Sequence, residues 1–90
     1  MVRNYDERFK ALAHPLRRAL LAEMSDSGRN LSHLVRKTGA PPSLISNHLR
    51  LLEQAQMIKT RPRGRGRVYQ LRKEGLQPVL AFLKSLLGEA

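Results

Sequence analysis

Two short amphipathic segments joined by a Gly-Ala-Pro linker constrain the fold of this 90-residue chain more than any other feature. The first segment, LSHLVRKT, follows Asn30, which suits a helix N-cap, and precedes Gly39, a common helix stop. The second segment, PSLISNHLRLLEQ, begins at Pro42, a residue that the first turn of a helix accommodates. A short helix, a tight turn that contains glycine and a longer second helix form a helix-turn-helix, which the sequence predicts over residues 31–54.

The second helix of this motif is predicted to present two different faces. One face is apolar at helical spacing and is expected to be buried, and it comprises Leu44, Ile45, His48, Leu49 and Leu52. The opposite face is polar, at positions i, i+3, i+4 and i+7, and it comprises Ser43, Ser46, Asn47 and Arg50.

The polar face has an unusual composition for a helix face that is only exposed to water. Lysine and glutamate, which are strong helix formers, would be expected on such a face. Short hydrogen-bonding groups and one arginine match the donors and acceptors of base edges in a DNA major groove. Asn47 can pair bidentately with adenine, and Arg50 can reach guanine or a phosphate. The alternative is an ordinary exposed face, because serine and asparagine are mediocre helix formers.

Basic charge is concentrated in the middle of the chain, whose formal net charge is +10. Residues 29–73 contain eleven basic side chains and a single acidic one, Glu53, whereas the segments on either side are nearly neutral. A basic block of this kind indicates a polyanionic partner. The alternative, a solvated arginine-rich surface, is less favoured because surfaces without such a partner usually mix both signs of charge.

The segment MIKTRPRGRGRVYQLRK predicts a β-hairpin over residues 57–72, with a turn rich in glycine and arginine. Gly64 and Gly66 are expected to let this turn adopt positive φ angles. Alternation along the strands is expected to place Arg63, Arg65 and Arg67 near the tip.

The basic side chains of the hairpin are expected to contact phosphates or a narrow minor groove. These candidate DNA contacts are Lys59, Arg61, Arg63, Arg65 and Arg67. A hairpin that carries charge only to prevent edge-to-edge aggregation is the alternative, but three alternating arginines exceed what that task needs.

Three further helices are predicted outside the motif. They cover residues 4–13, residues 15–24, and residues 75–88. In the second of these helices, the side chains expected to face inward are Leu16, Ala19, Leu20 and Met24.

The C-terminal helix is apolar around most of its circumference, so a chain of this size cannot cover it alone. Its remaining apolar surface predicts a homodimer that pairs through the two terminal helices. The expected interface residues are Tyr5, Phe9, Leu76, Val79, Leu80, Leu83, Leu86 and Leu87. A two-fold dimer would set the second motif helices of its two subunits about 34–36 Å apart, one turn of DNA, and so predicts an inverted-repeat operator.

A helix-turn-helix followed by a basic hairpin is the winged-helix pattern. The order and spacing of three segments resemble those of the corresponding segments in ArsR-type (ArsR/SmtB) winged-helix transcriptional regulators. These segments are FKALAHPLRRALLAEM, NLSHLVRKTGAPPSLISNHLRLLEQAQMI and RPRGRGRVYQL. The more specific parts are GRGRVYQL and the pattern S-x-H-L-x-x-L at residues 46–52. The resemblance implies a homodimeric repressor whose second motif helix reads the major groove, while the wing contacts the backbone or minor groove.

The chain departs from the family pattern at two points. Family members usually carry Ser or Thr at position 41 and often Gln at position 42, whereas this chain has Pro41 and Pro42. Neither proline can cap the helix with its side chain or contact a base, so readout must depend on the polar face described above.

The second departure concerns metal sensing. Many relatives bind metals through cysteines in the first motif helix, or through Asp and His on the C-terminal helix, and this chain has no cysteine at all. Its histidines, His14, His33 and His48, are far apart in sequence, and the first and last are expected to be structural. No metal and no cofactor are therefore expected.

Composition and motifs exclude several other classes of protein. The charged N-terminal segment does not resemble a signal peptide, and no apolar run approaches the roughly 20 residues of a membrane span, so we expect a cytoplasmic protein. No catalytic constellation is evident, so we do not expect an enzyme. The chain is predicted to form one mainly α-helical winged-helix domain over residues 1–90, which regulates transcription by binding specific DNA sequences.

Two other functions remain open from the sequence alone. A sequence-neutral architectural DNA-binding protein would use the same block of basic charge. A small RNA-binding or ribosome-associated protein is less favoured, because Tyr69 is the one aromatic residue near the basic block that could stack on unpaired bases.

Overall fold

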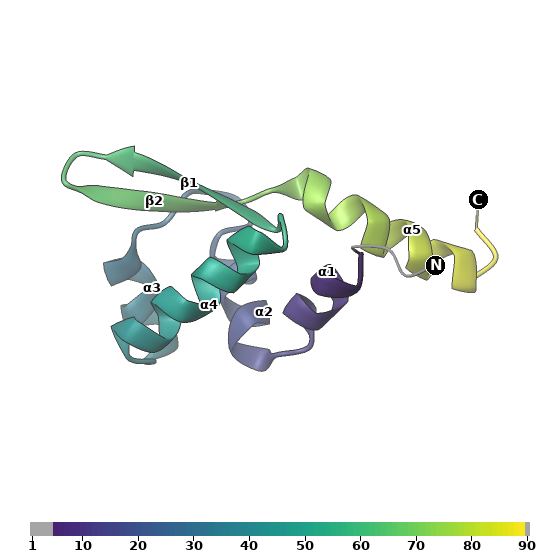
Figure 1. The fold of residues 1–90 in the computed structure, drawn as a ribbon, viewed down its shortest axis with the longest axis horizontal. Helices are drawn as coiled ribbons and strands as arrows, with labels where there is room; N and C mark the ends of the chain where they lie inside the picture. Colours follow the sequence, from purple (N-terminus) through teal and green to yellow (C-terminus); the bar gives the residue numbers. More distant parts are fainter. Residues whose placement is uncertain (1–4, 90) are drawn as a thin grey trace.

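The computed structural model describes residues 5–89, and the side chains of residues 6–89. It contains helices, a short 3₁₀ turn and one antiparallel hairpin (Figure 1). In chain order the elements are α1 (Tyr5–Leu12), α2 (Pro15–Glu23), α3 (Leu31–Thr38), α4 (Pro42–Gln54), β1 (Ile58–Arg63), β2 (Gly66–Leu71), η1 (Lys73–Leu76) and α5 (Gln77–Leu86). The mainly α-helical winged helix-turn-helix fold predicted from the sequence is confirmed.

The ends of the motif helices are set by the residues that the sequence indicated. The Asn30 side chain caps α3 by accepting a hydrogen bond from the backbone N–H of His33 at 2.8 Å. Gly39 ends α3 in the left-handed conformation, with φ +74°. Helix α4 begins at Pro42, and Pro41 before it offers no side-chain cap, as expected. These signals act within one helical turn, which is why they could be read from the sequence.

The core forms where α2, α3 and α4 meet, and its buried side chains are mostly leucine, isoleucine and methionine. The largest fully buried members are Leu20, Met24, Leu34, Ile45, Leu52, Met57 and Ile58. Two side chains expected to face the core are exposed, and the first is Ala19, in the middle of α2, where Leu21 is buried instead. Leu44 is 42% exposed because it lies at the edge of the apolar stripe of α4.

The hairpin pairs β1 with β2 in a register that places Ile58 opposite Leu71 and Arg63 opposite Gly66. A further bridge that the sequence did not predict joins Arg29 to Tyr69, with reciprocal N···O distances of 2.9 and 2.8 Å. This bridge ties the base of the hairpin to the loop before α3. The hairpin is therefore attached to the helix-turn-helix by backbone hydrogen bonds.

The C-terminal helix begins later than predicted. Residues 73–76 form the 3₁₀ turn η1, and the regular helix α5 starts at Gln77. Gly75, within η1, is buried against the backbone of Gln56 and Met57, so η1 docks directly on the turn between α4 and β1. This contact determines the direction in which α5 leaves the rest of the molecule.

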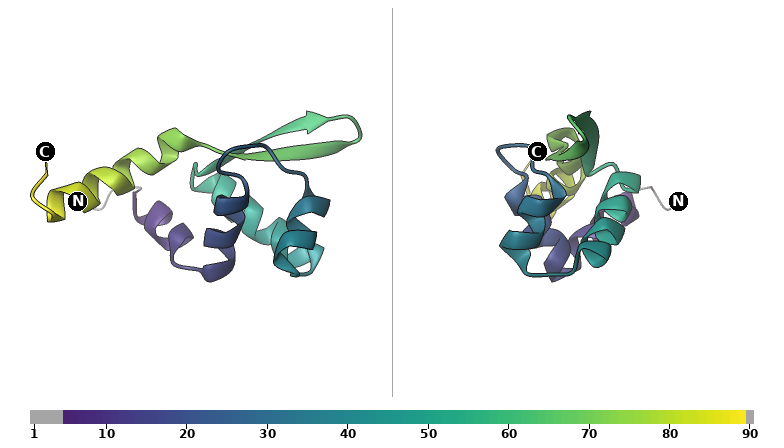
Figure 2. Two further views of the ribbon diagram at one scale, coloured as in Figure 1. Left: turned by 180° about the vertical axis from the view of Figure 1, so that it is seen from behind. Right: turned by 90° about the vertical axis from the view of Figure 1, so that its left-hand side faces the viewer.

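The molecule is elongated, with extents of 45 × 23 × 22 Å. The hairpin tip and the N-terminal half of α4 lie at one end, and α5 extends to the opposite end beside α1 (Figures 1 and 2). Basic and apolar surfaces are thus separated along the longest axis.

Candidate nucleic-acid interface

The polar face of α4 is exposed along its whole length. Its members, which we call the α4 ridge, are Ser43, Ser46, Asn47 and Arg50. Within the ridge, Arg50 Nη2 donates a hydrogen bond to Asn47 Oδ1 at 2.7 Å. Spacing alone placed these residues on one face, but it did not reveal that two of them bond to each other.

The hairpin, or wing, carries its basic side chains on two faces rather than in one row. Since residues directly opposite each other across a hairpin share a face, Lys59, Arg61 and Arg63 lie on one side. Arg67 lies on the other side, and Arg65 occupies the two-residue turn. All of them are exposed. The expectation that Gly64 and Gly66 both take positive φ was wrong in part, because among these two only Gly64 does.

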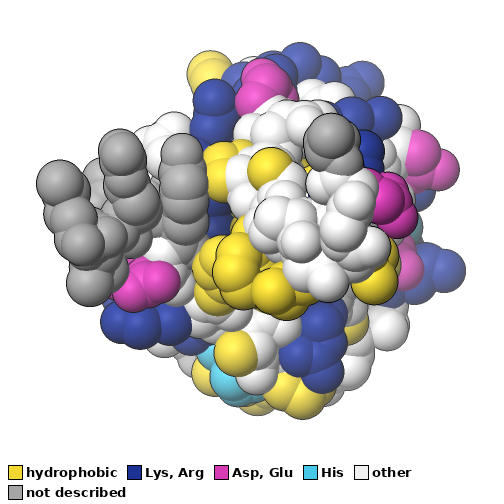
Figure 3. All heavy atoms as spheres, turned by 90° about the vertical axis from the view of Figure 1, so that its right-hand side faces the viewer, with side chains coloured by type: hydrophobic (Ala, Val, Ile, Leu, Met, Phe, Trp, Pro, Cys, Tyr) yellow, Lys and Arg dark blue, Asp and Glu magenta, His cyan; other side chains and the backbone are white. Residues whose placement is uncertain are grey.

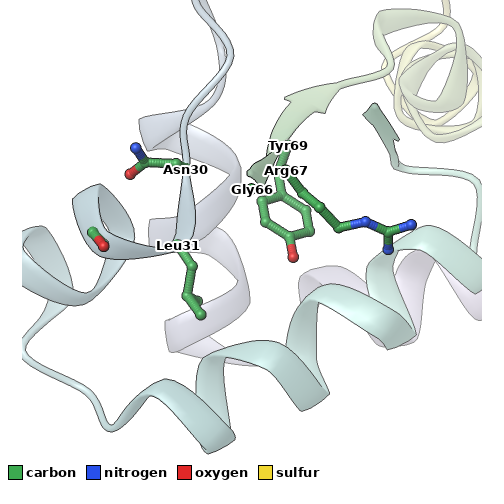
Figure 4. Close-up of a pocket in the computed structure, with 6 residues that line it drawn as sticks. Asn30, Leu31, Gly66, Arg67 and Tyr69 are labelled. Carbon is green, nitrogen blue, oxygen red and sulfur yellow. The ribbon is translucent and has the colours of Figure 1, made fainter. Parts of the chain in front are cut away.

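A shallow pocket of about 330 Å³ lies between the wing and the start of α3. Arg67 and Tyr69 from β2 form one wall of it, and Asn30 and Leu31 form the opposite wall (Figure 4). Arg67 therefore lies on the pocket side of the wing, on the face opposite Lys59, Arg61 and Arg63. The pairing of Arg29 with Tyr69, which the sequence did not predict, creates this arrangement.

His48 joins the buried side of α4 to α2. Its side chain is only 6% exposed, and its Nδ1 accepts a hydrogen bond from Arg17 Nε at 3.0 Å. The ring of His14 lies 4.6 Å from the His48 ring, and His14 Nδ1 caps α2 by accepting from the N–H of Leu16. Both histidines are structural, as the sequence indicated. No sequence signal pointed to Arg17, which is 31 positions from its partner.

The environment of His48 favours its neutral form. Burial lowers the pKa of His48 from its ordinary value of 6.5, and the positive charges of His14 and Arg17 lower this pKa further. In the unfolded chain the same imidazole binds a proton at higher pH than it does in the folded protein. The contribution of His48 to stability is therefore complete above about pH 6.5 and is lost as the pH falls below that value.

We expect acid to destabilise the protein in part through His48. The Tm of the wild type should fall between about pH 7 and about pH 5, and His48→Asn should remove part of this fall. Asparagine keeps a neutral acceptor for Arg17 and does not titrate. Thermal unfolding followed by circular dichroism at each pH gives the comparison. An identical pH dependence in the two proteins would contradict this role for His48.

The third histidine contacts an acidic side chain of the neighbouring helix. His33 Nε2 lies 2.9 Å from Glu23 Oε1, which joins α3 to α2. Within residues 5–89, no group of three or more His, Asp or Glu side chains is arranged to hold a metal ion. Over the same residues, no helix has both the length and the apolar character that crossing a bilayer requires.

A cluster of apolar side chains is exposed at the end of the molecule opposite the wing (Figure 3). Its large exposed side chains all come from α5 and the residue that follows it, and they are Leu80, Phe82, Leu83, Leu86 and Leu87. Leu86 and Leu87 are 68% and 74% exposed.

Other residues predicted at the dimer interface are partly or wholly covered within the subunit. Val79 is 6% exposed and Leu76 packs against the core, so neither offers much surface to a second chain. Phe9 packs edge-to-face on Phe82 of the same chain, with ring centroids 5.3 Å apart. The side chain of Tyr5, also predicted there, lies outside the described residues.

Comparison with known proteins identifies the family. Residues 14–60, slightly more than half of the chain, match the family model described as "Bacterial regulatory protein, arsR family". HTH-type transcriptional regulator Rv2034 of Mycobacterium tuberculosis is 34% identical over 82% of this chain and 69% of its own length. The HTH-type transcriptional repressor SmtB of the same species is 30% identical over 92% of this chain and 62% of its own length.

Solved structures agree with the sequence matches. The crystal structure of ArsR family transcriptional regulator RHA00566 superposes with a TM-score of 0.86 and is 29% identical, covering 96% of this chain and 94% of that one. The matched proteins are transcriptional regulators, so they support sequence-specific regulation and not the architectural alternative. The chain therefore belongs to the arsR family of bacterial regulatory proteins and is a DNA-binding transcriptional regulator with a winged helix-turn-helix fold.

Proposed function

We propose that this protein is a homodimeric repressor that binds an inverted-repeat operator. The observation that carries the proposal is the distribution of surfaces. The exposed α4 ridge and the arginine-bearing wing lie at one end of the molecule, and the exposed apolar side chains of α5 lie at the other (Figures 1 and 3). The relative SmtB is named a transcriptional repressor, which favours repression over activation.

The apolar surface of α5 supports the dimer. Five large hydrophobic side chains of α5 and the residue that follows it are 42% to 74% exposed. An isolated small domain rarely leaves an apolar patch of this kind exposed to water. A second copy of the chain can cover it by two-fold pairing of α5 with α5, which leaves both α4 ridges exposed. We propose that this dimer acts in the cytoplasm.

The α4 ridge and the wing would have different roles on DNA. The α4 ridge, on a single exposed helix, fits the width of a major groove and would read base edges. The wing residues Lys59, Arg61, Arg63, Arg65 and Arg67 would bind phosphates on either side of that groove. Because the charges of the wing are divided between its two faces, Arg67 would contact a different phosphate from Lys59, Arg61 and Arg63.

A comparison of DNA affinities tests the proposal. Genomic fragments bound by the wild-type protein would be sequenced, and the recovered inverted repeat would be compared with a shuffled duplex at one salt concentration. We expect the repeat to bind about 10³-fold or more tightly than the shuffled duplex. A ratio near one would overturn the proposal in favour of sequence-neutral binding.

Arg65→Ala should weaken binding to every duplex alike. Arg65 lies at the tip of the wing and is expected to contact a phosphate, so its removal should reduce the slope of log K against log salt by about one unit per site. Fluorescence anisotropy titrations over a range of salt concentrations measure this slope. Lys84→Ala, which removes an exposed basic side chain from α5 at the opposite end, serves as the matched control and should leave the slope unchanged. A change in which sequence is preferred would show instead that Arg65 reads bases.

A further inference from the structure

The hydrogen bond between Arg50 and Asn47 changes what these two side chains can recognise. A bidentate contact with adenine requires Asn47 Oδ1 to accept from the base while its Nδ2 donates. In the structure Oδ1 already accepts from Arg50 Nη2 at 2.7 Å, so the guanidinium competes with adenine for this acceptor. The paired side chains then offer the DNA mainly donors, from the amide nitrogen and from the remaining N–H groups of the guanidinium.

A second contact engages Glu53, the acidic residue of α4, with the wing instead of with Arg50. Glu53 lies three positions after Arg50, which is a spacing that favours an ion pair on a helix. Its Oε2 instead accepts a hydrogen bond from Thr60 Oγ1 of β1 at 3.0 Å. Within the described part of the chain, no carboxylate lies within 4.0 Å of the Arg50 guanidinium. The positively charged guanidinium of Arg50 is therefore hydrogen-bonded to a neutral amide, that of Asn47, on the exposed face of α4.

We infer that Asn47 and Arg50 form one reading unit that recognises a guanine in each half-site. Arg50 is the residue that contacts the base, and Asn47 is the residue that positions it. Guanine presents two neighbouring acceptors, N7 and O6, to the major groove, and a guanidinium held with its fork exposed is complementary to them. Because the bond to Asn47 restrains Arg50 before DNA arrives, less side-chain freedom is lost on binding. This inference rests on the proposed function, because it specifies how the same α4 ridge reads an operator.

Selection from a library of randomised duplexes tests the inference. The wild type, Arg50→Ala, Asn47→Ala and Asn47→Asp would each select duplexes at the same salt concentration. We expect the wild type to prefer guanine at one position of each half-site by roughly 10- to 100-fold, and Arg50→Ala to lose this preference. Asn47→Ala should weaken the preference at the same position, because Arg50 is then no longer held.

The aspartate variant separates positioning from a purely structural role. Asn47→Asp keeps an acceptor oxygen for Arg50, so it should retain the guanine preference while its negative charge lowers affinity for all duplexes. Replacing the selected guanine by 7-deazaguanine removes N7 and should weaken the wild type but not Arg50→Ala. Gln54→Ala, at an exposed position of α4 outside the α4 ridge, serves as the control for substitution of an exposed residue and should keep the guanine preference.

Two contrary results have different meanings. If Asn47→Ala abolished an adenine preference at a separate position and left the guanine preference intact, the two residues would be independent readers and the inference would be wrong. If the wild type selected a clear operator that neither substitution altered, the inference alone would fail. If the wild type selected no sequence at all, the proposed function itself would fail and the inference with it.

Discussion

Replacing Leu83 and Leu86 together with glutamate is expected to convert the protein to a monomer and to weaken operator binding by about 10²- to 10⁴-fold. Both side chains are exposed on α5, three positions apart on the same face of the helix. Two carboxylates on this surface would have to be buried without partners in the dimer, which opposes association. A monomer engages one half-site and loses the gain in effective concentration that the second half-site supplies.

Light scattering and anisotropy titrations together measure this effect. The wild type should have twice the 10.2 kDa mass of one chain at micromolar concentration, and the double variant should have the mass of a single chain. Lys84→Glu is the matched control, since it changes the net charge by the same two units on the same helix but outside the apolar surface. This control should remain dimeric. A monomeric wild type, or a double variant that stays dimeric, would refute the role given to α5.

The second large effect is expected from Gly75→Ala, which should destabilise the fold by about 1–3 kcal/mol or more. A Cβ atom at Gly75 would overlap the carbonyl oxygen of Gln56 and would lie 3.3 Å from Cα of Met57. Both neighbours are backbone atoms, so no change of side-chain rotamer can relieve the overlap. The turn before β1 and the turn η1 must separate instead, and α5 would move with them.

Gly66→Ala provides the comparison for this prediction. A methyl group at Gly66 would meet no atom within 4 Å, and this glycine does not adopt a positive φ, so alanine there should cost well under about 1 kcal/mol. Chemical denaturation of both variants at one protein concentration gives the two free energies, because the stability of a dimer depends on concentration. Equal stabilities would show that the contact at Gly75 is not tight in solution.

Local sequence signals were sufficient for the elements of the motif. Asn30, Gly39 and Pro42 each act on backbone groups within a turn of their own position, so their effect does not depend on the rest of the fold. The same holds for the polar face of α4, because the period of 3.6 residues fixes which side chains share a face. The exposure of Ser43, Ser46, Asn47 and Arg50 was therefore predictable, whereas their roles on DNA stay a prediction.

Features that depend on which element covers which surface could not be predicted from the sequence. Along α5 the apolar side chains look alike in the sequence, yet Val79 is buried within the subunit while Leu86 is 68% exposed. Only the packing of α1 and η1 against α5 separates these two residues. In the same way, strand pairing placed Arg67 on the opposite face of the wing from Arg61 and Arg63.

The sequence by itself determined the helix boundaries of the motif, the hairpin and the polar and basic character of the surfaces that we propose contact DNA. The tertiary structure alone decided the contacts between distant residues: Arg17 with His48, Arg29 with Tyr69 and Gly75 against Gln56. The physical reason is the range of the forces involved. Capping, helical periodicity and strand alternation act over a few residues, whereas burial and hydrogen bonding between distant segments depend on the packing of the whole chain.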